Sequence, residues 1–451
     1  MIGTGVDRRM TILRHLLASL FLLASLGEGH WSAVAQSFAF GGAIYDSGKC
    51  ASITDFTGVD PTGNMDSTAG IQAAISATPS GGALCIPNGS YLISGSGSCI
   101  LSRATAIRLL GVGEPLFIVA GGVPSTRNII CLAPTGPTVG WQISGLSIQG
   151  SGGVARGQHA IYIDTTAPGS LLYNCIISDN TLSVTAGGHS IHVNNSQSTG
   201  GFFNSQIERN NIESIYFADV GDSITIAYNT INSNTSNTNP GIYVYQVVGS
   251  AGLEIFANNI ASISGHILID GGVMPIIRDN ELETPTGFVN GRGAMIEIIG
   301  SVNPLWSPQM VNNVISALAG TGSPIPIKIT NATNALVQGG RINVIAGSHI
   351  SVGASATDTK IDQNSIQAVT NNVIGQLVVT DVGTRTIVSP LLVRPGPVSA
   401  LPTCNAAAKG WHAYVTDASQ ALRAGIGAVV ASGGTNNVPV GCDGTSWRIG
   451  G

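Results

Sequence analysis

Charged side chains are scarce in this 451-residue chain. They make up 10% of it, with 19 basic and 24 acidic residues and a formal net charge of -5, whereas ordinary soluble domains carry roughly 25%. Only four lysines occur, and without a basic excess a nucleic-acid-binding surface is not expected. The composition also lacks the Ala, Glu, Lys and Leu enrichment of coiled coils and helical bundles.

Hydrophobic residues, glycine and asparagine are abundant instead. The 43% hydrophobic content is too high for an intrinsically disordered chain. The 60 glycines and 31 asparagines are turn formers, and many of the hydrophobic residues are β-branched. This composition predicts strands joined by tight turns, in a chain long enough for a large core.

The first 35 residues are predicted to be a signal peptide. Three arginines precede the apolar run Leu16–Leu26, and Ala33–Ala35 supplies the small residues of a cleavage site. The run is too short to span a bilayer, and Met1 and Met10 are both suitable start residues. A secreted, periplasmic or cell-surface protein without a membrane span is expected.

The cysteines predict disulfides. Their odd number implies that one thiol is left over in an oxidising compartment. The first four predict two disulfides of unspecified pairing, Cys404 and Cys442 predict a third, and Cys175 is predicted to be free and buried. No cysteine pair has metal-ligand spacing, and neither a metal nor another cofactor is predicted. The seven cysteines are Cys50, Cys85, Cys99, Cys131, Cys175, Cys404 and Cys442.

A repeat organises the middle of the chain. Each copy has an apolar residue, two variable residues, an asparagine, one variable residue and then Ile, Leu or Val. The mean period is about 26 residues, and Gly340 takes the place of the asparagine in one copy. The motif asparagines are Asn180, Asn210, Asn229, Asn258, Asn280, Asn312 and Asn364.

Each unit of the repeat also contains two further apolar residues, separated by one residue, which are joined to the asparagine motif by a variable loop. We call these two residues the apolar pair. This alternation is the periodicity of a strand with one buried face. Such short units bury their apolar faces only by stacking, which predicts a β-solenoid with parallel sheets. The asparagines are expected at left-handed turn positions with their amides stacked. The alternative, an antiparallel sandwich, does not explain the fixed order of motif, loop and pair. Four of the pair residues are expected to stack in one sheet, namely Ile191, Ile242, Ile267 and Ile296.

The N-terminal segment carries a family resemblance. Ile53–Phe56, Ile71–Ile75 and Ile86–Ile93 follow one another in close order, and residues 53–94 resemble the opening of the pectate-lyase-like superfamily of right-handed parallel β-helix proteins. The resemblance implies an all-β, right-handed, single-stranded parallel β-helix. We expect about nine coils between residues 100 and 375, in a domain spanning 36–389. A helix near 67–78, with Asp66 or Ser67 as its N-cap, is expected to cover the open end of the solenoid.

The composition changes after the last coil. Residues 390–402 contain several prolines and are predicted to be a linker. The segment 403–451 resembles a small β module at the ends of phage-tail-like and β-helix proteins of bacteria, and a homotrimer through this module is one expectation. A simple cap for the C-terminal end of the solenoid is the alternative.

The familiar active sites of the superfamily are not expected here. The resemblance implies extracellular polysaccharide as the ligand class, but fold alone does not fix function. Polygalacturonase-like members carry an Asp-Asp pair, which this chain lacks. Calcium-dependent pectate lyases use a carboxylate cluster, whereas Asp164 and Asp270 are predicted to lie four coils apart, about 19 Å.

The outward residues of the paired apolar strands form the candidate site. Aromatic rings on a flat sheet suit stacking on sugar rings, and His, Tyr and Glu side chains can act as acid or base. Successive coils place side by side Tyr162, His192, Tyr216, Tyr243, Leu268, Glu297, Lys328 and Ser351. The catalytic candidates are His192, Tyr216 and Glu297. The substrate-binding candidates are Tyr162, Tyr243, Tyr245, Asp270, Arg292 and Lys328.

Two classes of function fit these residues. The first is a depolymerase of an extracellular acidic polysaccharide, acting by β-elimination with His192 as base and Tyr216 as acid, or by hydrolysis with an unfamiliar carboxylate pair. The second is a non-catalytic glycan-binding or structural surface protein, such as an adhesin or a tail-like rod. The row also has a purely structural interpretation, because neighbours such as Glu297 and Lys328 stabilise any sheet by cross-strand pairing.

Overall fold

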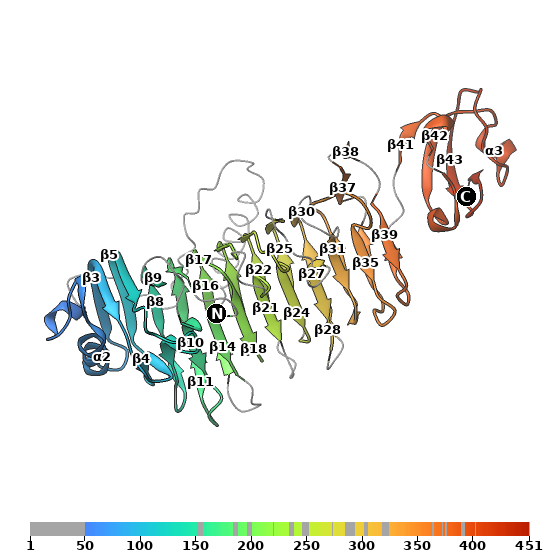
Figure 1. Ribbon diagram of the computed structural model, residues 1–451. Helices are drawn as coiled ribbons and strands as arrows, with labels where there is room; N and C mark the ends of the chain where they lie inside the picture. Colours follow the sequence, from blue (N-terminus) through green and yellow to red (C-terminus); the bar gives the residue numbers. More distant parts are fainter. Residues whose placement is uncertain are drawn as a thin grey trace, which may run out of the picture. The chain divides into compact units, whose positions relative to one another are not determined.

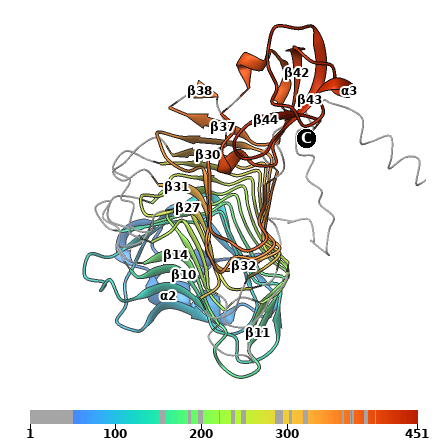
Figure 2. The same ribbon diagram turned by 90° about the vertical axis from the view of Figure 1, so that its right-hand side faces the viewer.

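The chain folds into a parallel β-solenoid followed by a small, mostly antiparallel sheet (Figure 1, Figure 2). The predicted right-handed parallel β-helix with a capping helix and a C-terminal β module is confirmed, with about ten turns instead of nine. The computed structural model describes residues 50–150, 157–183, 188–195, 201–219, 221–233, 239–245, 252–272, 274–284, 294–301, 305–317, 324–362, 365–371, 373–374, 377–388, 393–401 and 403–450. The predicted signal peptide lies outside these residues.

One face of the solenoid is an 11-stranded parallel sheet. Its ladder joins Ile191 through Ile215 to Ile242, and Ile242 through Ile267 to Ile296. All five isoleucines are buried, which confirms the predicted stack. In order, the strands are β4 (Cys99–Arg103), β6 (Asn128–Leu132), β10 (His159–Asp164), β14 (His189–Asn194), β18 (Ile215–Ala218), β21 (Ile242–Tyr245), β24 (Ile267–Asp270), β27 (Ala294–Ile299), β31 (Ile325–Ile329), β35 (Ile350–Val352) and β39 (Val379–Asp381).

The other faces are two arms of a 24-stranded sheet, joined by the long strands β3 (Ala83–Ile93) and β5 (Arg108–Val119). The first arm contains β1 (Ala51–Ser52), β8 (Gln142–Ser144), β12 (Ile176–Ser178), β16 (Ser205–Glu208), β19 (Ile224–Ala227), β22 (Leu253–Phe256), β25 (Ile276–Arg278), β29 (Gln309–Val311), β33 (Leu336–Gln338), β36 (Lys360–Asp362) and β40 (Ile387–Val388). The second contains β2 (Thr62–Asp66), β9 (Ser147–Gly150), β13 (Thr181–Leu182), β17 (Asn211–Ile212), β20 (Thr230–Ile231), β23 (Asn259–Ile260), β26 (Glu281–Glu283), β30 (Val314–Ala317), β34 (Arg341–Val344), β37 (Gln367–Thr370) and β38 (Val373–Ile374). Two short sheets at the corners comprise β7 (Thr138–Val139), β11 (Leu171–Tyr173) and β15 (Gly201–Phe203), and β28 (Leu305–Trp306) and β32 (Ala332–Thr333).

A ladder of buried asparagines runs along the turn between the two arms. The side-chain N–H of Asn229 donates to Oδ1 of Asn258 at 2.9 Å, and Asn258 donates likewise to Asn280 at 2.9 Å. The predicted stacking of amides is confirmed. The left-handed position, however, belongs to the preceding residue, such as Tyr228 with φ 58°. The asparagine itself points inward, because its amide satisfies backbone groups of the turn, including the Ile226 carbonyl.

The motif predicts Asn312 in this ladder, but the structure places Asn313 there. The Asn280 amide donates to Oδ1 of Asn313, and Asn312 is the left-handed residue with φ 54°. Ile315 is therefore the buried residue of β30, paired with Leu282. The sequence carries a signal for the correct register, because Met310 supplies the leading apolar residue for Asn313 whereas Gln309 stands at that place for Asn312. The motif residue Asn364 lies outside the described residues.

The capping helix α2 (Thr68–Ala77) agrees with the predicted helix near 67–78. It buries Ile71, Ala74 and Ile75 on one face against the core of the solenoid. Asp66 accepts the Thr68 backbone N–H at 3.0 Å. Ser67 is the N-cap by position, but its hydroxyl accepts the backbone N–H of Asp60 and makes no capping bond.

Three disulfides are present, and they agree with the predicted grouping. Cys50 pairs with Cys85, and Cys99 with Cys131. Each of these two spans about one coil, so each ties neighbouring coils together and restricts the unfolded chain, typically worth about 2–4 kcal/mol. The third disulfide joins Cys404 to Cys442. Cys175 is free and buried, as predicted.

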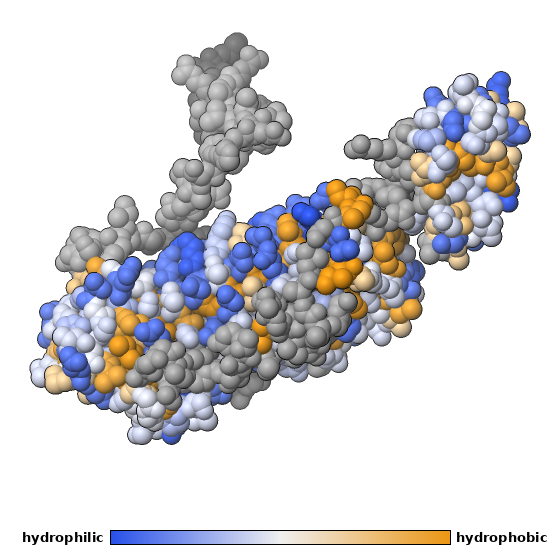
Figure 3. All heavy atoms as spheres, turned by 45° about the horizontal axis from the view of Figure 1, so that its top comes forward, coloured by the Kyte–Doolittle hydropathy of each residue, from blue (hydrophilic) through white to orange (hydrophobic). Residues whose placement is uncertain are grey.

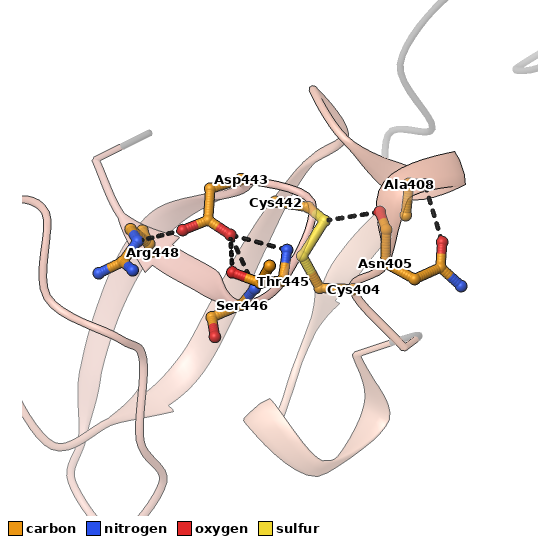
Figure 4. The surroundings of a disulfide bond; sticks show 8 residues. All are labelled: Cys404, Asn405, Ala408, Cys442, Asp443, Thr445, Ser446 and Arg448. Carbon is orange, nitrogen blue, oxygen red and sulfur yellow. Dashed lines mark hydrogen bonds and ion pairs between the residues drawn. A yellow bond between two sulfur atoms is a disulfide. The ribbon is translucent and has the colours of Figure 1, made fainter.

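The C-terminal module has its own small core. Its sheet contains β41 (Val393–Gly396), β42 (His412–Ala418), β43 (Asn436–Cys442) and β44 (Trp447–Ile449), with a short helix α3 (Leu422–Gly425). Its 3-10 turns are Val398–Ala400 and Ala406–Ala408. A further 3-10 turn, Ile53–Asp55, follows β1 at the other end of the chain. Near the disulfide, Asp443 accepts hydrogen bonds from Thr445, Ser446 and Arg448 (Figure 4). The hydrogen bond from Arg448 contributes most to holding the pKa of Asp443 far below its usual range.

Candidate functional site

Four ring-bearing residues lie next to one another on the outer face of the 11-stranded sheet. The register pairs Tyr162 with His192, His192 with Tyr216, and Tyr216 with Tyr243. Their strand neighbours face the core, and because side chains alternate along a strand, these four face outward. Neighbouring strands are about 4.8 Å apart, a spacing at which rings touch.

Two further histidines, His159 and His189, extend this row into a cluster of six rings. The rings of His159 and His192 meet edge-on with centroids 4.2 Å apart, and His189 stacks on Tyr216 at 5.0 Å. Tyr216 and Tyr243 lie 4.9 Å apart. Aromatic pairs in such arrangements typically contribute about 0.5–1.5 kcal/mol each beyond their buried area. We call this group the ring cluster; its members are His159, Tyr162, His189, His192, Tyr216 and Tyr243.

Hydrogen bonds orient three members of the ring cluster. The His189 backbone N–H donates to Nδ1 of His159 at 3.0 Å, so the proton of neutral His159 lies on Nε2. The Asn194 side chain donates to the Tyr162 hydroxyl oxygen at 2.9 Å, which leaves the hydroxyl proton for another acceptor. Nδ1 of His189 lies 3.2 Å from the Ser214 hydroxyl.

Burial keeps the ring cluster uncharged at neutral pH. It is the main reason that the pKa of His159 is lowered to about 4, that of His189 to about 3 and that of His192 to about 2; the neighbouring histidines add a smaller part of the last two shifts. Burial also raises the pKa of Tyr162 and of Tyr216, with a smaller contribution from nearby Asp164 at Tyr162. The site therefore presents neutral rings and hydroxyl groups to a ligand.

His192 lacks the partner that an acid–base histidine normally has. In the described part of the chain, its Nδ1 is buried and makes no hydrogen bond. Catalytic histidines usually donate that N–H to a carboxylate or carbonyl, which orients the ring and stabilises the imidazolium. Only Nε2 of His192 is placed to exchange a proton with a ligand, and a charged ring would be costly there.

Glu297 does not join the ring cluster. It lies four strands from His192 in the ladder, about 19 Å away at the usual strand spacing, and the buried Leu268 separates it from Tyr243. Glu297 is 6% exposed, and its carboxylate accepts a hydrogen bond from Lys328 at 2.8 Å. Glu297 and His192 are therefore too far apart to act on one glycosidic bond, and the Glu297–Lys328 pair has the geometry of a cross-strand contact.

The remaining predicted binding residues occupy different surroundings. Tyr245 is half-buried and pairs in register with Asp270, so it extends the outer face beyond Tyr243. Asp270 is buried, and its carboxylate accepts the backbone N–H and the hydroxyl of Ser301, both at 2.8 Å. Those bonds hold the following turn and leave Asp270 little capacity for a ligand. Arg292 lies outside the described residues.

The sequence analysis missed His159, His189 and Asn194 as members of the site. Strict alternation places residues three apart on opposite faces, so His159 and Tyr162 were not expected together. Their rings nevertheless stack with centroids 5.7 Å apart. A sequence signal exists, because a histidine precedes the outward ring by three residues in two successive coils, at His159/Tyr162 and at His189/His192.

The described residues place no group of three His, Cys, Asp or Glu side chains where it could hold a metal ion. Within the same part of the chain, no helix has the length and hydrophobicity needed to cross a membrane.

Comparison with known proteins shows likeness to solved structures at the level of the fold. No protein-family model matches the chain, and no curated protein matches it. A DFA-IIIase from Arthrobacter chlorophenolicus has a TM-score of 0.48 and 11% identity, over 74% of this chain and 98% of that one. The surface adhesin PfbA of Streptococcus pneumoniae has a TM-score of 0.47 and 14% identity, over 75% of this chain and 93% of that one.

A third structure is the catalytic unit of an alpha-1,3-glucanase from Streptomyces thermodiastaticus. Its TM-score is 0.43 and its identity 16%, over 76% of this chain and 70% of that one. Likeness at this level concerns the type of fold alone. Since a single type of fold hosts unrelated functions, it assigns no activity to this chain.

Proposed function

We propose that the protein acts outside the cell and binds a polysaccharide through the ring cluster. The observation that carries this proposal is the row of rings from Tyr162 to Tyr243, on successive strands of one flat sheet. Sugar rings are apolar on their C–H faces and carry hydroxyls at their edges. Adjacent aromatic faces with neutral hydroxyl and imidazole groups between them match both properties. The three disulfides support an extracellular location.

Binding has better support than cleavage. A general base needs a stabilised protonated form, and burial opposes one at His192, whose pKa it lowers to about 2. Glu297 is too distant to supply the second group. The acidic groups Asp164 and Asp270 near the outer face also repel an acidic sugar. The one described cation on this row, Lys328, is already paired with Glu297.

Depolymerisation by β-elimination is the second candidate, and one contact favours it. His192 and Tyr216 lie in adjacent coils with ring centroids 4.8 Å apart, so a base and an acid could act on one sugar from the same side. Elimination would also need a group that neutralises the carboxylate of an acidic sugar, and Arg292 is the candidate in the chain for that role.

The test is incubation of the exported protein with a panel of neutral and acidic polysaccharides. Binding is followed by isothermal calorimetry, and cleavage by the ultraviolet absorbance of unsaturated ends and by reducing sugars. Tyr216→Ala is expected to weaken binding at least ~10-fold, because it removes the central ring and opens a gap in the row. Tyr228→Ala is the matched control, since Tyr228 is 55% exposed on a different face.

The outcomes separate the candidates. Binding that falls in Tyr216→Ala and persists in Tyr228→Ala supports the ring cluster as the glycan site. Cleavage that is lost in His192→Ala and in Tyr216→Phe would make the protein a depolymerase. Binding that is equal in both tyrosine variants would remove the ring cluster from the proposal.

A further inference from the structure

A second row of outward side chains runs beside the ring cluster, two residues further along the same strands. The register pairs Asp164 with Asn194, Asn194 with Ala218, and Ala218 with Tyr245. All four are half-buried. Residues two apart on a strand are separated by about 6.6 Å and neighbouring strands by about 4.8 Å, so one sugar residue can touch both rows. The second row changes from polar to apolar between Asn194 and Ala218.

Apolar surface alone does not identify the class of sugar. Figure 3 shows hydrophobic residues at several places on the solenoid and on the C-terminal module, and sugar rings of every kind have apolar faces. The polar groups beside the ring cluster are more selective, because each unsatisfied donor or acceptor requires its complement in the ligand.

Asp164 offers an acceptor that the protein leaves unused. Its Oδ1 accepts the Thr166 backbone N–H at 3.0 Å and the Thr166 hydroxyl at 2.7 Å. Within the described part of the chain, no group donates to Oδ2 of Asp164, and no lysine or arginine pairs with it. A carboxylate oxygen beside aromatic rings forms a strong, charge-assisted hydrogen bond with an N–H or O–H group of a ligand.

Tyr162 offers a donor beside this acceptor. The Asn194 amide donates to the Tyr162 hydroxyl oxygen at 2.9 Å, so the hydroxyl proton remains available. Because Asn194 is the register neighbour of Asp164, this bond holds the hydroxyl over the second row. Burial raises the pKa of Tyr162, and the charge of Asp164 raises it further, so the hydroxyl stays protonated and acts as a donor.

An acetamido group has parts that complement all of these features. Its carbonyl can accept the Tyr162 O–H, its N–H can donate to Oδ2 of Asp164, and its methyl can pack on Ala218. A carboxylated sugar offers no donor at this position and is repelled by Asp164. A sugar hydroxyl can make these hydrogen bonds, but it brings no apolar group to Ala218, the next residue of the row after Asn194.

We propose that the ring cluster takes glycans that contain N-acetylated amino sugars, and that Tyr162, Asp164, Asn194 and Ala218 form a subsite for the acetamido group. We call these four residues the acetamido subsite. Its assignment rests on the polysaccharide binding proposed above and adds the class of sugar. The acetamido group is uncharged, so its amide bonds to the subsite while the sugar ring stacks on the neutral rings beside it.

The test compares two hexasaccharides of the same β-linkage, one of N-acetylglucosamine and one of glucose. Calorimetry with the exported chain should give an at least ~10-fold lower dissociation constant for the acetylated one, because a carboxylate-bound N–H and a buried methyl add to the ring contacts. Tyr162→Phe keeps the ring and removes the donor. Asp164→Asn keeps an acceptor for Thr166 and puts an N–H group in place of Oδ2. Each variant should reduce the preference to below ~3-fold.

Glu281→Gln is the matched control for the loss of one negative charge, since Glu281 is exposed on β26, in the second arm of the 24-stranded sheet. This variant should keep the full preference, and circular dichroism verifies that all three variants fold. A second measurement is saturation-transfer NMR of the bound acetylated hexasaccharide. Transfer should reach the acetamido methyl as strongly as the protons of the sugar rings, because the methyl contacts the protein directly.

The outcomes separate the acetamido subsite from glycan binding itself. Equal binding of both hexasaccharides, weakened by Tyr216→Ala, would overturn the subsite and leave the ring cluster as a glycan site. A preference that survives in both Tyr162→Phe and Asp164→Asn, or a methyl that receives no saturation, would also overturn the subsite. If no polysaccharide of the wider panel binds, the proposed function itself fails and the subsite fails with it.

Discussion

The ring of His192 meets the ring of Tyr216 edge-on, with the centroids 4.8 Å apart, across the neighbouring strands β14 and β18. The edge of an aromatic ring is electropositive and its face electronegative, so this arrangement is attractive without any charge. Both groups are neutral at ordinary pH, since burial lowers the pKa of His192 and raises that of Tyr216. The centre of the candidate site is therefore a neutral contact.

The neutrality of the ring cluster predicts that glycan binding does not depend on pH between about 5 and 8. An ordinary histidine changes charge in that range, but the pKa of His159, the highest of the three, is lowered to about 4. Calorimetric titrations at several pH values would measure this. A binding constant that changes tenfold with a midpoint near 6.5, the ordinary histidine pKa, would contradict the assigned protonation states.

The same histidines predict a loss of stability in acid. In the unfolded chain each titrates near the ordinary histidine pKa of about 6.5. In the folded chain, burial lowers the pKa of His159 to about 4 and that of His189 to about 3. Below a pH of about 6.5 the unfolded chain therefore binds more protons, and the free energy of unfolding falls as the pH drops toward about 4. From pH 7 to pH 5 each histidine should contribute a loss of about 2 kcal/mol.

Denaturant midpoints at pH 7 and pH 5 measure this loss. His189→Gln should lose less stability between the two pH values than the unmodified chain, because glutamine does not titrate. The matched control is His412→Gln, since His412 is exposed on the C-terminal module. Equal pH dependence in the His189 and His412 variants would show that His189 is not buried in its neutral form.

The asparagine ladder predicts a sharp contrast between adjacent residues. Asn258→Ala removes the acceptor for both the backbone and the side-chain N–H of Asn229, and leaves those buried donors unpaired. Each unpaired buried group costs about 1–3 kcal/mol. Asn259→Ala is the control, because Asn259 is exposed on β23, and its effect should lie within about 0.5 kcal/mol.

Thermal or denaturant unfolding of the two asparagine variants measures the contrast. A comparable loss of stability in both would mean that the ladder contributes little. A loss confined to Asn258→Ala would establish it as a stabilising element of the solenoid.

Cys175 is predicted to be inert in the native protein. Burial raises the pKa of its thiol far above the usual range, so the reactive thiolate is absent at neutral pH. A thiol reagent should label no residue of the native exported chain quickly, and should label one residue per chain after denaturation without reductant. Rapid native labelling at Cys175 would contradict its burial and would point to opening of the solenoid at β12.

The repeat in the sequence was sufficient to predict which isoleucines stack. Ile191, Ile242 and Ile267 follow one another in one ladder because the strand alternation and the coil period are both visible locally. The outward row from Tyr162 to Tyr243 could be read in the same way. The register failed at Asn312 and Asn313 although the sequence distinguishes them, because Met310 supplies the apolar residue three before Asn313 whereas Gln309 stands three before Asn312. The pairing of Ile315 with Leu282 follows the Asn313 register.

The sequence by itself determined the solenoid, its capping helix and the grouping of its disulfides, because periodicity, capping and cysteine spacing are properties of short stretches of chain. Only the tertiary structure decided that His159 and His189 join Tyr162 and His192, since their rings meet through the packing of strand starts in adjacent coils. The tertiary structure also separated Glu297 from His192 and bound it to Lys328. The protonation state of His192 was also decided by the tertiary structure. Its pKa is lowered to about 2 mainly by burial, and the atoms that bury it come together only when the coils stack.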